Sequence, residues 1–453
     1  MKIPEDVQAI LRTLESAGYE AWCVGGCVRD TLPSRGRQLG RAPEDWDVTT
    51  SARPEKTLAL FGDRAEPTGL RHGTVTVKTP AGPVEVTTFR IDGTYHDHRR
   101  PDSVAFTNSL EEDLARRDFT VNAMALNLRG ELRDPFGGQE DLERNTLRCV
   151  GDPDRRFQED ALRILRGMRF AAVLGLEEDG ETGRAMERNR ELLRSIAPER
   201  VRAELVKLLC GRRARDVLDR HPLVVGVFWP EVLPMLQFDQ RNVHHCYDVW
   251  DHSTIAMMET PPVPMLRCAA LLHDVGKPSS FTLDEAGVGH FYGHAKASAS
   301  LADAMLRRLR FSNDFRERTV RLIEWHDRDI PRTDKGVRRA LRALGEEDLR
   351  LVLDLKRADN LAQAPAYWGR QAEIQKGEDI LNRLLAEDAC FSLRQLAVRG
   401  GDLLALGLGG PAVGAALETL LEKVVDGALP NDRTVLLEYL QKTREADEER
   451  GPA

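Results

Sequence analysis

The sequence predicts an α+β fold, with a small mixed-sheet head followed by all-helical parts. Over residues 1 to about 145, short β-branched runs such as Thr74–Lys78 and Val84–Phe89 alternate with helical segments. From about Asp152 onward the apolar spacing is helical, as in Arg202–Leu209. The 453 residues, 41% hydrophobic and 30% charged, suffice for two to four globular domains.

We expect four parts along the chain. They are a head, a helical neck, a larger helical domain and a helical tail, at residues 1–150, 151–225, 226–365 and 366–453. A proline-rich stretch at His221–Pro234 indicates a joint, because proline seldom sits inside a helix. We expect a short hairpin or lid at Phe281–Tyr292, and no other sheet after Asp152.

Composition excludes several classes of protein. No apolar run approaches the ~20 residues of a membrane span, and the N-terminus lacks a signal-peptide pattern, so we expect a cytoplasmic protein without a membrane partner. The seven cysteines are scattered without a C-x-x-C pair, which predicts reduced, mostly buried thiols rather than structural zinc. The net charge of −8 argues against a protein that coats nucleic acid.

A glycine pair lies where the first predicted strand passes into a helix. Gly25 and Gly26 follow the strand Tyr19–Val24, and Arg29 comes one helical turn later. Glycine permits close backbone approach to a phosphate, and the arginine supplies positive charge. A glycine pair alone is more often a structural turn, so this motif needs support from others.

Three carboxylates are candidate metal ligands in the head. Asp45 and Asp47 are two residues apart, a spacing that places both on one face of a strand. Glu85, on a later predicted strand, could be a third member. Oxygen anions suit Mg²⁺, which shares its shell with waters and substrate phosphates. The three residues together therefore suggest a two-metal phosphoryl-transfer site. Without Glu85, the pair Asp45-x-Asp47 would be interpreted as a solvated turn.

One helix face after the head carries a row of charge. We expect Arg156–Phe170 to open the first neck helix, with Asp160 and Arg163 as i, i+3 neighbours and with Arg166 and Arg169 continuing the row. The row is either an exposed ion-pair ladder or a base reader. A carboxylate only accepts and a guanidinium only donates, so one such pair can accept cytosine and adenine and refuse guanine and uracil.

A second set of candidate metal ligands lies in the larger helical domain. His252, His273, Asp274 and Asp359 come from three separate helical segments, and imidazole with carboxylate suits a divalent transition metal. His294 and His326 could extend the site to a second metal. A lone His-Asp pair would be background, and the histidines could instead serve only as a hydrogen-bonded scaffold.

Taken in order, these motifs resemble the class II tRNA nucleotidyltransferases, the CCA-adding and A-adding enzymes of the poly(A) polymerase family, here with a fused HD domain. The resemblance covers roughly the first 210 residues. The motifs that carry it are Gly25-Gly-x-x-Arg-Asp30, Asp45-Trp-Asp47, Gly69–Val75, Val84–Arg90 and Arg116–Ala123.

The resemblance implies roles for individual residues. Asp45 and Asp47 would hold Mg²⁺, with Gly25, Gly26 and Arg29 at the phosphates. Arg117 and Asp118 would contact the nucleotide, Asp118 at the ribose, while Asp160, Arg163, Arg166 and Arg169 would read the base without a template. The HD motif would place His252, His273, Asp274 and Asp359 on a metal.

The implied activity is addition of AMP, and of CMP, from ATP and CTP to the 3′ end of tRNA. The segment Asp92–Pro101 resembles the flexible loop of enzymes that add the terminal adenosine. An adenosine-only enzyme would carry the same motifs and stays an alternative; poly(A) synthesis ranks below both. The HD domain would hydrolyse phosphoesters such as 2′,3′-cyclic phosphates, and a phosphohydrolase with a nucleotide-sensing head is the alternative from another class. The oligomeric state is left open.

A tRNA partner must be reconciled with the net charge of −8. Basic residues cluster at Arg212–Arg215, Arg307–Arg310 and Lys335–Arg342. Each cluster is either a solvated helix face or a strip for RNA phosphates.

Overall fold

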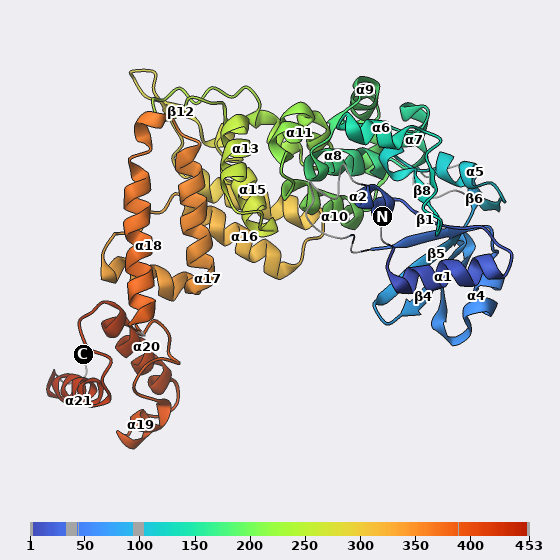
Figure 1. The fold of residues 1–453 in the computed structure, drawn as a ribbon. Coiled ribbons are helices and arrows are strands. Elements are labelled where there is room, and N and C mark those ends of the chain that lie inside the picture. Colours follow the sequence, from blue (N-terminus) through green and yellow to red (C-terminus); the bar gives the residue numbers. More distant parts are fainter. Residues whose placement is uncertain (1–2, 33–42, 44, 94–103, 388, 451–453) are drawn as a thin grey trace. The chain divides into compact units, whose positions relative to one another are not determined.

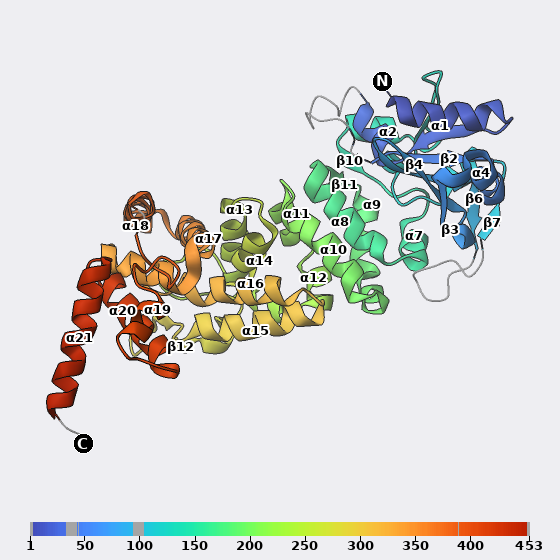
Figure 2. The same cartoon turned by 90° about the horizontal axis from the view of Figure 1, so that it is seen from below.

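The computed structural model describes residues 3–32, 43, 45–93, 104–387 and 389–450. The chain folds into two compact units, Met1–Leu233 with Met305–Phe311, and Pro234–Ala304 with Ser312–Ala453 (Figures 1 and 2). The finer division at residues 150, 225 and 365 stays a prediction.

The first unit is built on a mixed seven-stranded sheet, as the sequence predicts. The strand order is β3-β4-β5-β2-β1-β8-β9. β2 and β5 are parallel and all other neighbours are antiparallel. The strands are β1 (Ala21–Val24), β2 (Asp47–Thr50), β3 (Ala65–Gly69), β4 (Thr74–Thr79), β5 (Gly82–Thr88), β8 (Ala125–Leu126) and β9 (Leu132–Arg133), and a separate antiparallel pair is β6 (Arg90–Asp92) with β7 (Val104–Phe106).

Helices cover the sheet. α1 (Glu5–Ser16) and α4 (Pro54–Phe61) lie side by side against it (Figure 1). α1 presents one apolar face, from Val7 to Leu14, to the core because its apolar residues recur at helical spacing. The other head helices are α2 (Gly26–Thr31), α5 (Leu110–Ala115) and α6 (Gly138–Glu143), with the 3₁₀ turns η1 (Gly62–Arg64), η2 (Leu70–His72) and η3 (Thr120–Asn122).

The neck is a helical layer centred on α8 (Leu162–Leu174), which packs against α10 (Pro198–Leu209) and α11 (Ala214–Arg220). Ten of its thirteen residues are buried, so it forms the core of the layer. The remaining elements are α7 (Pro153–Glu159), α9 (Gly180–Arg188), α12 (Pro222–Phe228), η4 (Arg190–Ser195) and η5 (Pro230–Met235).

The expectation of no sheet in the neck was wrong at one place. β10 (Thr146–Leu147) pairs in parallel with β11 (Glu177–Glu178). The pair is closed by backbone hydrogen bonds from Glu177 N to Asn145 O at 2.8 Å and from Asp179 N to Leu147 O at 2.9 Å. Strands of two residues leave no alternation in the sequence, and therefore no signal.

The second unit is helical apart from one hairpin. β12 (Thr282–Leu283) and β13 (Gly289–His290) form it, which confirms the hairpin expected at Phe281–Tyr292. α17 (Asp334–Leu361) breaks at Gly345, where φ is +76°, and lies beside α18 (Arg370–Ala386) (Figure 1). The other elements up to this point are α13 (Val249–Glu259), α14 (Pro264–Leu272), α15 (His294–Arg308), α16 (Asn313–His326), η6 (Pro278–Ser280) and η7 (Pro365–Tyr367).

The C-terminal helices have a core of their own. It joins α19 (Gly400–Ala405), α20 (Pro411–Val425) and α21 (Arg433–Arg450) through buried leucine and valine side chains. None of the described helices is both long enough and apolar enough to span a membrane. All seven cysteines are free and five are buried, as predicted.

Replacing Gly138 by alanine is expected to destabilise the head. A Cβ here would lie 2.2 Å from the carbonyl oxygen of Thr120, the first residue of η3. Overpacking of this kind costs about 1–3 kcal/mol, so the melting temperature should fall by several degrees. Gly183→Ala is the control, since its Cβ would meet no atom closer than 3.7 Å. Equal melting temperatures for both variants would contradict the packing described.

Candidate nucleotide site and metal centre

The glycine pair lies where the sequence places it, between β1 and α2. Gly25 turns the chain with φ +84°, a conformation that side chains disfavour, and Gly26 is the first residue of α2. A Cβ on Gly25 would lie 3.4 Å from Nη1 of Arg117. The turn therefore brings backbone that carries no side chain close to a guanidinium, which is a suitable setting for an anion.

Two of the three predicted carboxylates come together in the sheet. Asp47 opens β2 and is the register partner of Glu85 on the parallel strand β5. Register partners on neighbouring strands are about 5 Å apart, so both side chains can reach one cation. Across β1, Asp47 faces Val24, the residue before the glycine turn.

Asp45 lies two residues before β2, so the expectation that both aspartates sit within one strand was wrong. Pairing starts at Asp47 because β1 turns away after Val24 and offers no earlier partner. Trp46 is buried while Asp45 and Asp47 are exposed, so the alternation continues and both carboxylates face the same side.

The charges around Asp47 favour a cation. Although Asp47 keeps exposed surface, the protein atoms around its carboxylate displace water and, together with the charges of Glu85 and Asp45, raise its pKa, whereas the charge of Arg117 opposes this. Three oxygen anions with one nearby guanidinium form a donor set that fits Mg²⁺.

Arg29 and Arg117, the two head arginines predicted to contact the nucleotide, differ in the side chains that they pair with. All three guanidinium nitrogens of Arg29 donate, Nε and Nη2 to Asp30 at 2.6 and 3.0 Å and Nη1 to Asn122 Oδ1 at 2.6 Å. Arg29 thus ties α2 to η3 in this conformation. Arg117 lies 3.5 Å from Asp113, and its burial lowers the pKa of the guanidinium although Asp113 opposes this. Contact of either arginine with phosphate stays a prediction.

Asp118 connects the head to α8. Its Oδ2 accepts from Arg166 Nε at 2.8 Å and lies 2.6 Å from Arg166 Nη2, while its Oδ1 accepts from the backbone N–H of Phe119 at 2.8 Å. Burial alone would raise the pKa of this carboxyl, but the charge and hydrogen bonds of Arg166 lower it to about 2. The residue that the resemblance places at the ribose is therefore a buried, charged acceptor.

The continuous helix expected over Arg156–Phe170 is divided, so that expectation was wrong. α7 ends at Glu159, and Asp160 is extended, with φ −136° and ψ 103°. Its carboxylate accepts a hydrogen bond from the N–H of Leu162 at 3.1 Å. This local side-chain hydrogen bond takes the place of a backbone hydrogen bond of the helix. Asp160 and Arg163 consequently lie on either side of a helix start, and not on one continuous helix face.

The arginine row on α8 is present, and each member meets an acid. Arg163 pairs with Glu159 at 2.8 Å and Arg166 with Asp118. Arg169 pairs with Glu204 of α10, and its guanidinium lies 3.9 Å from the ring centroid of Phe170. Arg29 and Arg166 also approach that ring, at 5.5 and 5.4 Å. The row is thus a network of buried ion pairs around one aromatic ring.

Two members of this network had no sequence signal. Arg200, on α10, donates to Asp160 Oδ2 at 3.1 Å, and Glu204 follows it one turn later. Both lie 35 or more residues from their partners, so only the folded chain brings them to the site.

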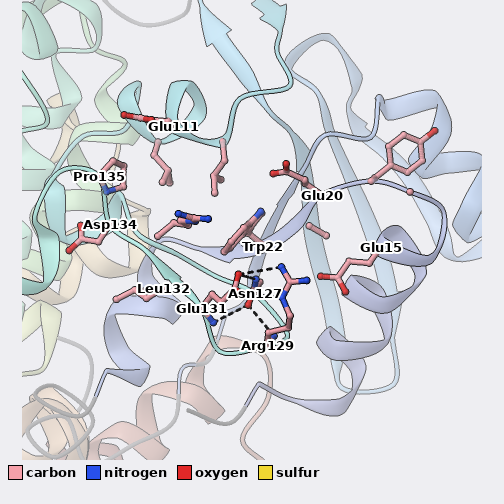
Figure 3. A pocket seen from close by; sticks show the side chains of 16 residues that line it. Glu15, Glu20, Trp22, Glu111, Asn127, Arg129, Glu131, Leu132, Asp134 and Pro135 are labelled. Atoms are coloured by element: carbon pink, nitrogen blue, oxygen red, sulfur yellow. Dashed lines mark hydrogen bonds and ion pairs between the residues drawn. The ribbon is translucent and has the colours of Figure 1, made fainter.

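A cavity of about 840 Å³ in the head lies away from this site (Figure 3). It opens beside Trp22, near the end of β1 that is remote from Asp47, and Glu131 and Arg129 lie at its edge. Asn127 donates to Glu131 there at 2.8 Å. None of the predicted site residues lines it.

The second unit brings the predicted HD residues together. His252 Nε2 lies 3.0 Å from Asp359 Oδ1 and 3.4 Å from Asp274 Oδ2. His273 Nε2 lies 3.1 Å from the same oxygen of Asp274. α13, α17 and the turn after α14 supply these residues, so long-range packing builds the cluster.

His294 and His326 complete a second half on the other oxygen of Asp274. Their Nε2 atoms lie 3.4 and 3.8 Å from Asp274 Oδ1, and 3.2 Å from each other. Asp274 therefore bridges two groups, each of which could hold a metal ion. These positions are compatible with the predicted second metal ion at His294 and His326, which stays a prediction.

The imidazoles are oriented for metal binding. Each Nδ1 lies within hydrogen-bond distance of a backbone carbonyl, which can only accept, so Nδ1 carries a proton and Nε2 is the nitrogen left to hold either a second proton or a metal ion. The partners are Ala362 for His252 at 3.1 Å, Ala270 for His273 at 2.7 Å, Phe291 for His294 at 2.9 Å and Ile323 for His326 at 2.6 Å.

Imidazole nitrogens and carboxylates that face each other attract positive charge. The buried Asp274 has Lys277 Nζ at 2.6 Å and His273 Nε2 at 3.1 Å from its Oδ2. Burial would lower the pKa of His273, but the charges of Asp274 and Asp359 raise it to about 10. The site therefore attracts positive charge, and mixed imidazole and carboxylate donors fit a divalent transition metal.

The basic clusters are joined to nearby acids. Arg308 pairs with Glu231, Arg213 with Asp216 and Arg339 with Asp426, at 2.5 to 2.7 Å. These contacts favour the solvated-face interpretation for those members. The loop expected at Asp92–Pro101 lies almost entirely outside the described residues.

Comparisons with known proteins identify related domains in both units of the chain. The family model described as the Poly A polymerase head domain matches residues 21–148. One described as a probable RNA and SrmB-binding site of polymerase A matches residues 175–220, and the HD domain model matches residues 242–364.

Full-length relatives are named CCA-adding enzyme. That of Levilactobacillus brevis is 34% identical over 96% of this chain and 98% of the relative, and that of Streptococcus pyogenes is 32% identical over 98% of both. The crystal structure of Bacillus stearothermophilus CCA-adding enzyme with CTP covers both chains fully, with a TM-score of 0.73 and 29% identity. A Thermotoga maritima CCA-adding enzyme complexed with tRNA shares the fold, with a TM-score of 0.57, 18% identity and coverage of 97% and 96%.

Asp118→Asn is expected to lower stability in a pH-dependent way. The folded pKa of about 2 lies below the ordinary 3.8. The carboxylate therefore stabilises the fold above pH 4, by about 2 kcal/mol, and this contribution is lost as pH falls through 2. The difference in melting temperature between wild type and Asp118→Asn should narrow from pH 7 to pH 3. Asp63→Asn, an exposed control, should show no difference, and a gap for Asp118→Asn that is independent of pH would contradict the ion pair.

Proposed function

The chain belongs to the family of CCA-adding enzymes, and we propose that it synthesises or repairs the 3′ CCA end of tRNA from CTP and ATP. The observation that carries this proposal is the register of Asp47 with Glu85 beside the Gly25 turn. This register supports the proposal because it brings two carboxylates that could hold Mg²⁺ close to a glycine turn that could approach a triphosphate.

The proposed mechanism is positioning plus charge neutralisation, as in phosphoryl transfer generally. Asp45, Asp47 and Glu85 hold Mg²⁺, which when bound neutralises the triphosphate and makes the 3′-hydroxyl of tRNA a better nucleophile. Gly25 and Gly26 leave room for the phosphates, and Arg117, close to Gly25, supplies a positive charge.

Sugar choice is assigned to Asp118. Its buried carboxylate, held by Arg166, can accept a hydrogen bond from a ribose 2′-hydroxyl. A deoxyribose would leave that acceptor without this partner, so ribonucleotides are favoured.

Base choice is assigned to Asp160 and Arg163. Asp160 pairs with Arg200, and Arg163 pairs with Glu159. Base reading therefore requires an exchange of partners, in which Asp160 accepts from the exocyclic amine of C or A and Arg163 donates to the adjacent ring nitrogen. Arg166 and Arg169 hold α8 in place through Asp118 and Glu204.

Two tRNA substrates distinguish a CCA-adding enzyme from one that adds only adenosine. A tRNA lacking CCA and a tRNA ending in CC are each incubated with CTP and ATP. Extension of both supports CCA addition, whereas extension of only the CC-ended tRNA identifies an adenosine-adding enzyme. We place the activity in the cytoplasm because the proposal rests on tRNA as substrate.

We propose a second activity, metal-dependent phosphoester hydrolysis, for the HD centre. Asp274 bridges the His252–His273 and His294–His326 pairs, one oxygen facing each pair. One or two divalent transition metals held there would activate a water for attack on phosphorus. Phosphoesters such as 2′,3′-cyclic phosphates are the proposed substrates. A phosphohydrolase whose head only senses nucleotide is disfavoured, because Asp45, Asp47 and Glu85 are all present in the head.

Asp47→Ala is expected to abolish nucleotide addition. Removing a metal-binding carboxylate takes away several kcal/mol of charge stabilisation, so incorporation of labelled CMP into tRNA lacking CCA should fall by roughly three orders of magnitude. Asp63→Ala, which removes an exposed carboxylate from the same head, should retain full incorporation. Full activity in Asp47→Ala would remove the basis for the site assignment.

His273→Ala is expected to abolish hydrolysis of 2′,3′-cyclic AMP while CMP incorporation continues. Metal analysis of the purified protein should show that the variant holds fewer divalent ions per chain. Asp47→Ala provides the reciprocal control, with hydrolysis retained and addition lost. If the wild type hydrolyses no phosphoester with Mg²⁺, Mn²⁺, Co²⁺ or Ni²⁺, the proposed second activity is wrong.

A further inference from the structure

A cavity of about 420 Å³ lies over the HD centre. Asp274, His294, His326 and Asp359 line it together with the segments 242–245 and 288–293, and Lys277 and Arg370 are among its other lining residues. The second segment includes β13 and the residues that lead into α15. The cavity therefore connects the metal-ligand cluster with the hairpin.

The wall of this cavity carries unusually exposed apolar side chains. Tyr292 is 79% exposed and Val243 is 73% exposed, the highest values among the exposed large hydrophobic residues of the described chain. Both line the cavity. Exposed apolar side chains grouped beside a polar centre are typical of a ligand site.

Tyr292 is part of an ordered stack. Its ring lies parallel to that of His290, with centroids 5.4 Å apart and an interplanar angle of 9°. His290 Nε2 lies 2.9 Å from Asp284 Oδ2, and Asp284 also accepts from the N–H groups of Ala286 and Val288 at 2.9 Å. The hairpin turn thus holds His290, whose ring lies parallel and offset beside that of Tyr292, while the high exposure leaves most of the Tyr292 ring open.

The hairpin is fixed to the unit. Gly289 donates to the carbonyl of Arg241 at 2.8 Å. Phe281 packs against Phe238 and Phe291, with centroids 5.3 and 5.5 Å apart. The Tyr292 ring is therefore presented from an anchored element, so a ligand that stacks on it does not first have to order the hairpin.

The cavity also has cations for a phosphate. Lys277, only 4% exposed, donates to Gln240 Oε1 at 2.8 Å and lies beside Asp274. Arg370, the first residue of α18, is exposed and lines the cavity. An aromatic platform and cations share one cavity with the cluster of metal ligands.

We propose that Tyr292, backed by His290, stacks the nucleobase of a ribonucleoside phosphoester whose phosphate lies at the HD centre. The substrate class is thus a nucleobase-bearing phosphoester, either a free nucleoside 2′,3′-cyclic phosphate or an RNA end that carries one. This inference rests on the hydrolytic activity proposed above and assigns its specificity to a residue outside the metal cluster.

The reaction is a hydrolysis without redox change. The oxygen of water forms a new bond to phosphorus, one P–O bond to the ribose breaks, and the released ribose oxygen takes a proton. Tyr292 binds the base and takes no part in the bond changes, so its loss raises KM and leaves kcat nearly unchanged. The expected rise is about 5- to 30-fold, the scale of base stacking on an aromatic ring.

The test uses the full-length protein loaded with Mn²⁺ and three substrates. These are 2′,3′-cyclic AMP, a short RNA ending in a 2′,3′-cyclic phosphate, and glycerol 1,2-cyclic phosphate, which has no base. Tyr292→Ala should raise the KM for the two substrates that carry a base and leave the KM for glycerol 1,2-cyclic phosphate unchanged. Tyr292→Phe should retain the wild-type KM. Leu283→Ala is the control, an exposed hairpin residue outside the cavity. If Tyr292→Ala raises the KM more for the RNA than for 2′,3′-cyclic AMP, the preferred substrate is an RNA end and not a free nucleoside cyclic phosphate.

A binding measurement separates this inference from the hydrolytic activity. Adenosine 2′-monophosphate is titrated calorimetrically into metal-free protein, with saturating CTP to occupy the head. Tyr292→Ala should weaken binding about 5- to 30-fold, even if the wild type hydrolyses nothing. Unchanged binding, or an equal KM rise for glycerol 1,2-cyclic phosphate, overturns the stacking role whether or not hydrolysis is observed.

Discussion

The ion pair between Asp118 and Arg166 is the interaction on which the nucleotide site depends. Burying a carboxylate is costly unless a counter-charge and hydrogen bonds meet it, and Asp118 has both. The pair connects the end of the head sequence to α8. Asn122 donates to Asp118 and accepts from Arg29, which lies over Phe170 of α8. The helix after the glycine turn, Asp118 and α8 therefore share one buried polar network, which joins the proposed phosphate, ribose and base positions.

Much of the head could be predicted because its signals are local. β4, β5 and the passage from β1 through Gly25 into α2 follow from alternation, β-branched residues and glycine. The pairing of Asp47 with Glu85 was less accessible, since it needs the register of two strands that are far apart in sequence. The break at Asp160 was missed because one side-chain hydrogen bond overrides the helical periodicity around it.

The second unit shows the same limit. The residues of the metal cluster were recognisable as a motif, but their division into two halves around Asp274 appears only when α13, α15, α16 and α17 are packed. Charge patterns were similarly ambiguous. Clusters such as Arg339 and its neighbours meet acids from other helices, so a count of basic residues does not identify an RNA surface. The negative total charge is thus compatible with an enzyme that binds tRNA through a few local contacts.

The central claim, template-free synthesis of a CCA end, is tested most directly by the product itself. A tRNA transcript lacking CCA is incubated with the full-length protein, Mg²⁺ and all four ribonucleoside triphosphates, and the 3′ ends are then sequenced. The arrangement of Asp118, Asp160 and Arg163 predicts that only the ribonucleotides C and A are added, with no G or U, and membership of the CCA-adding family predicts the order C, C and A followed by a stop. Unextended ends, or ends that carry runs of adenosine, would contradict the account.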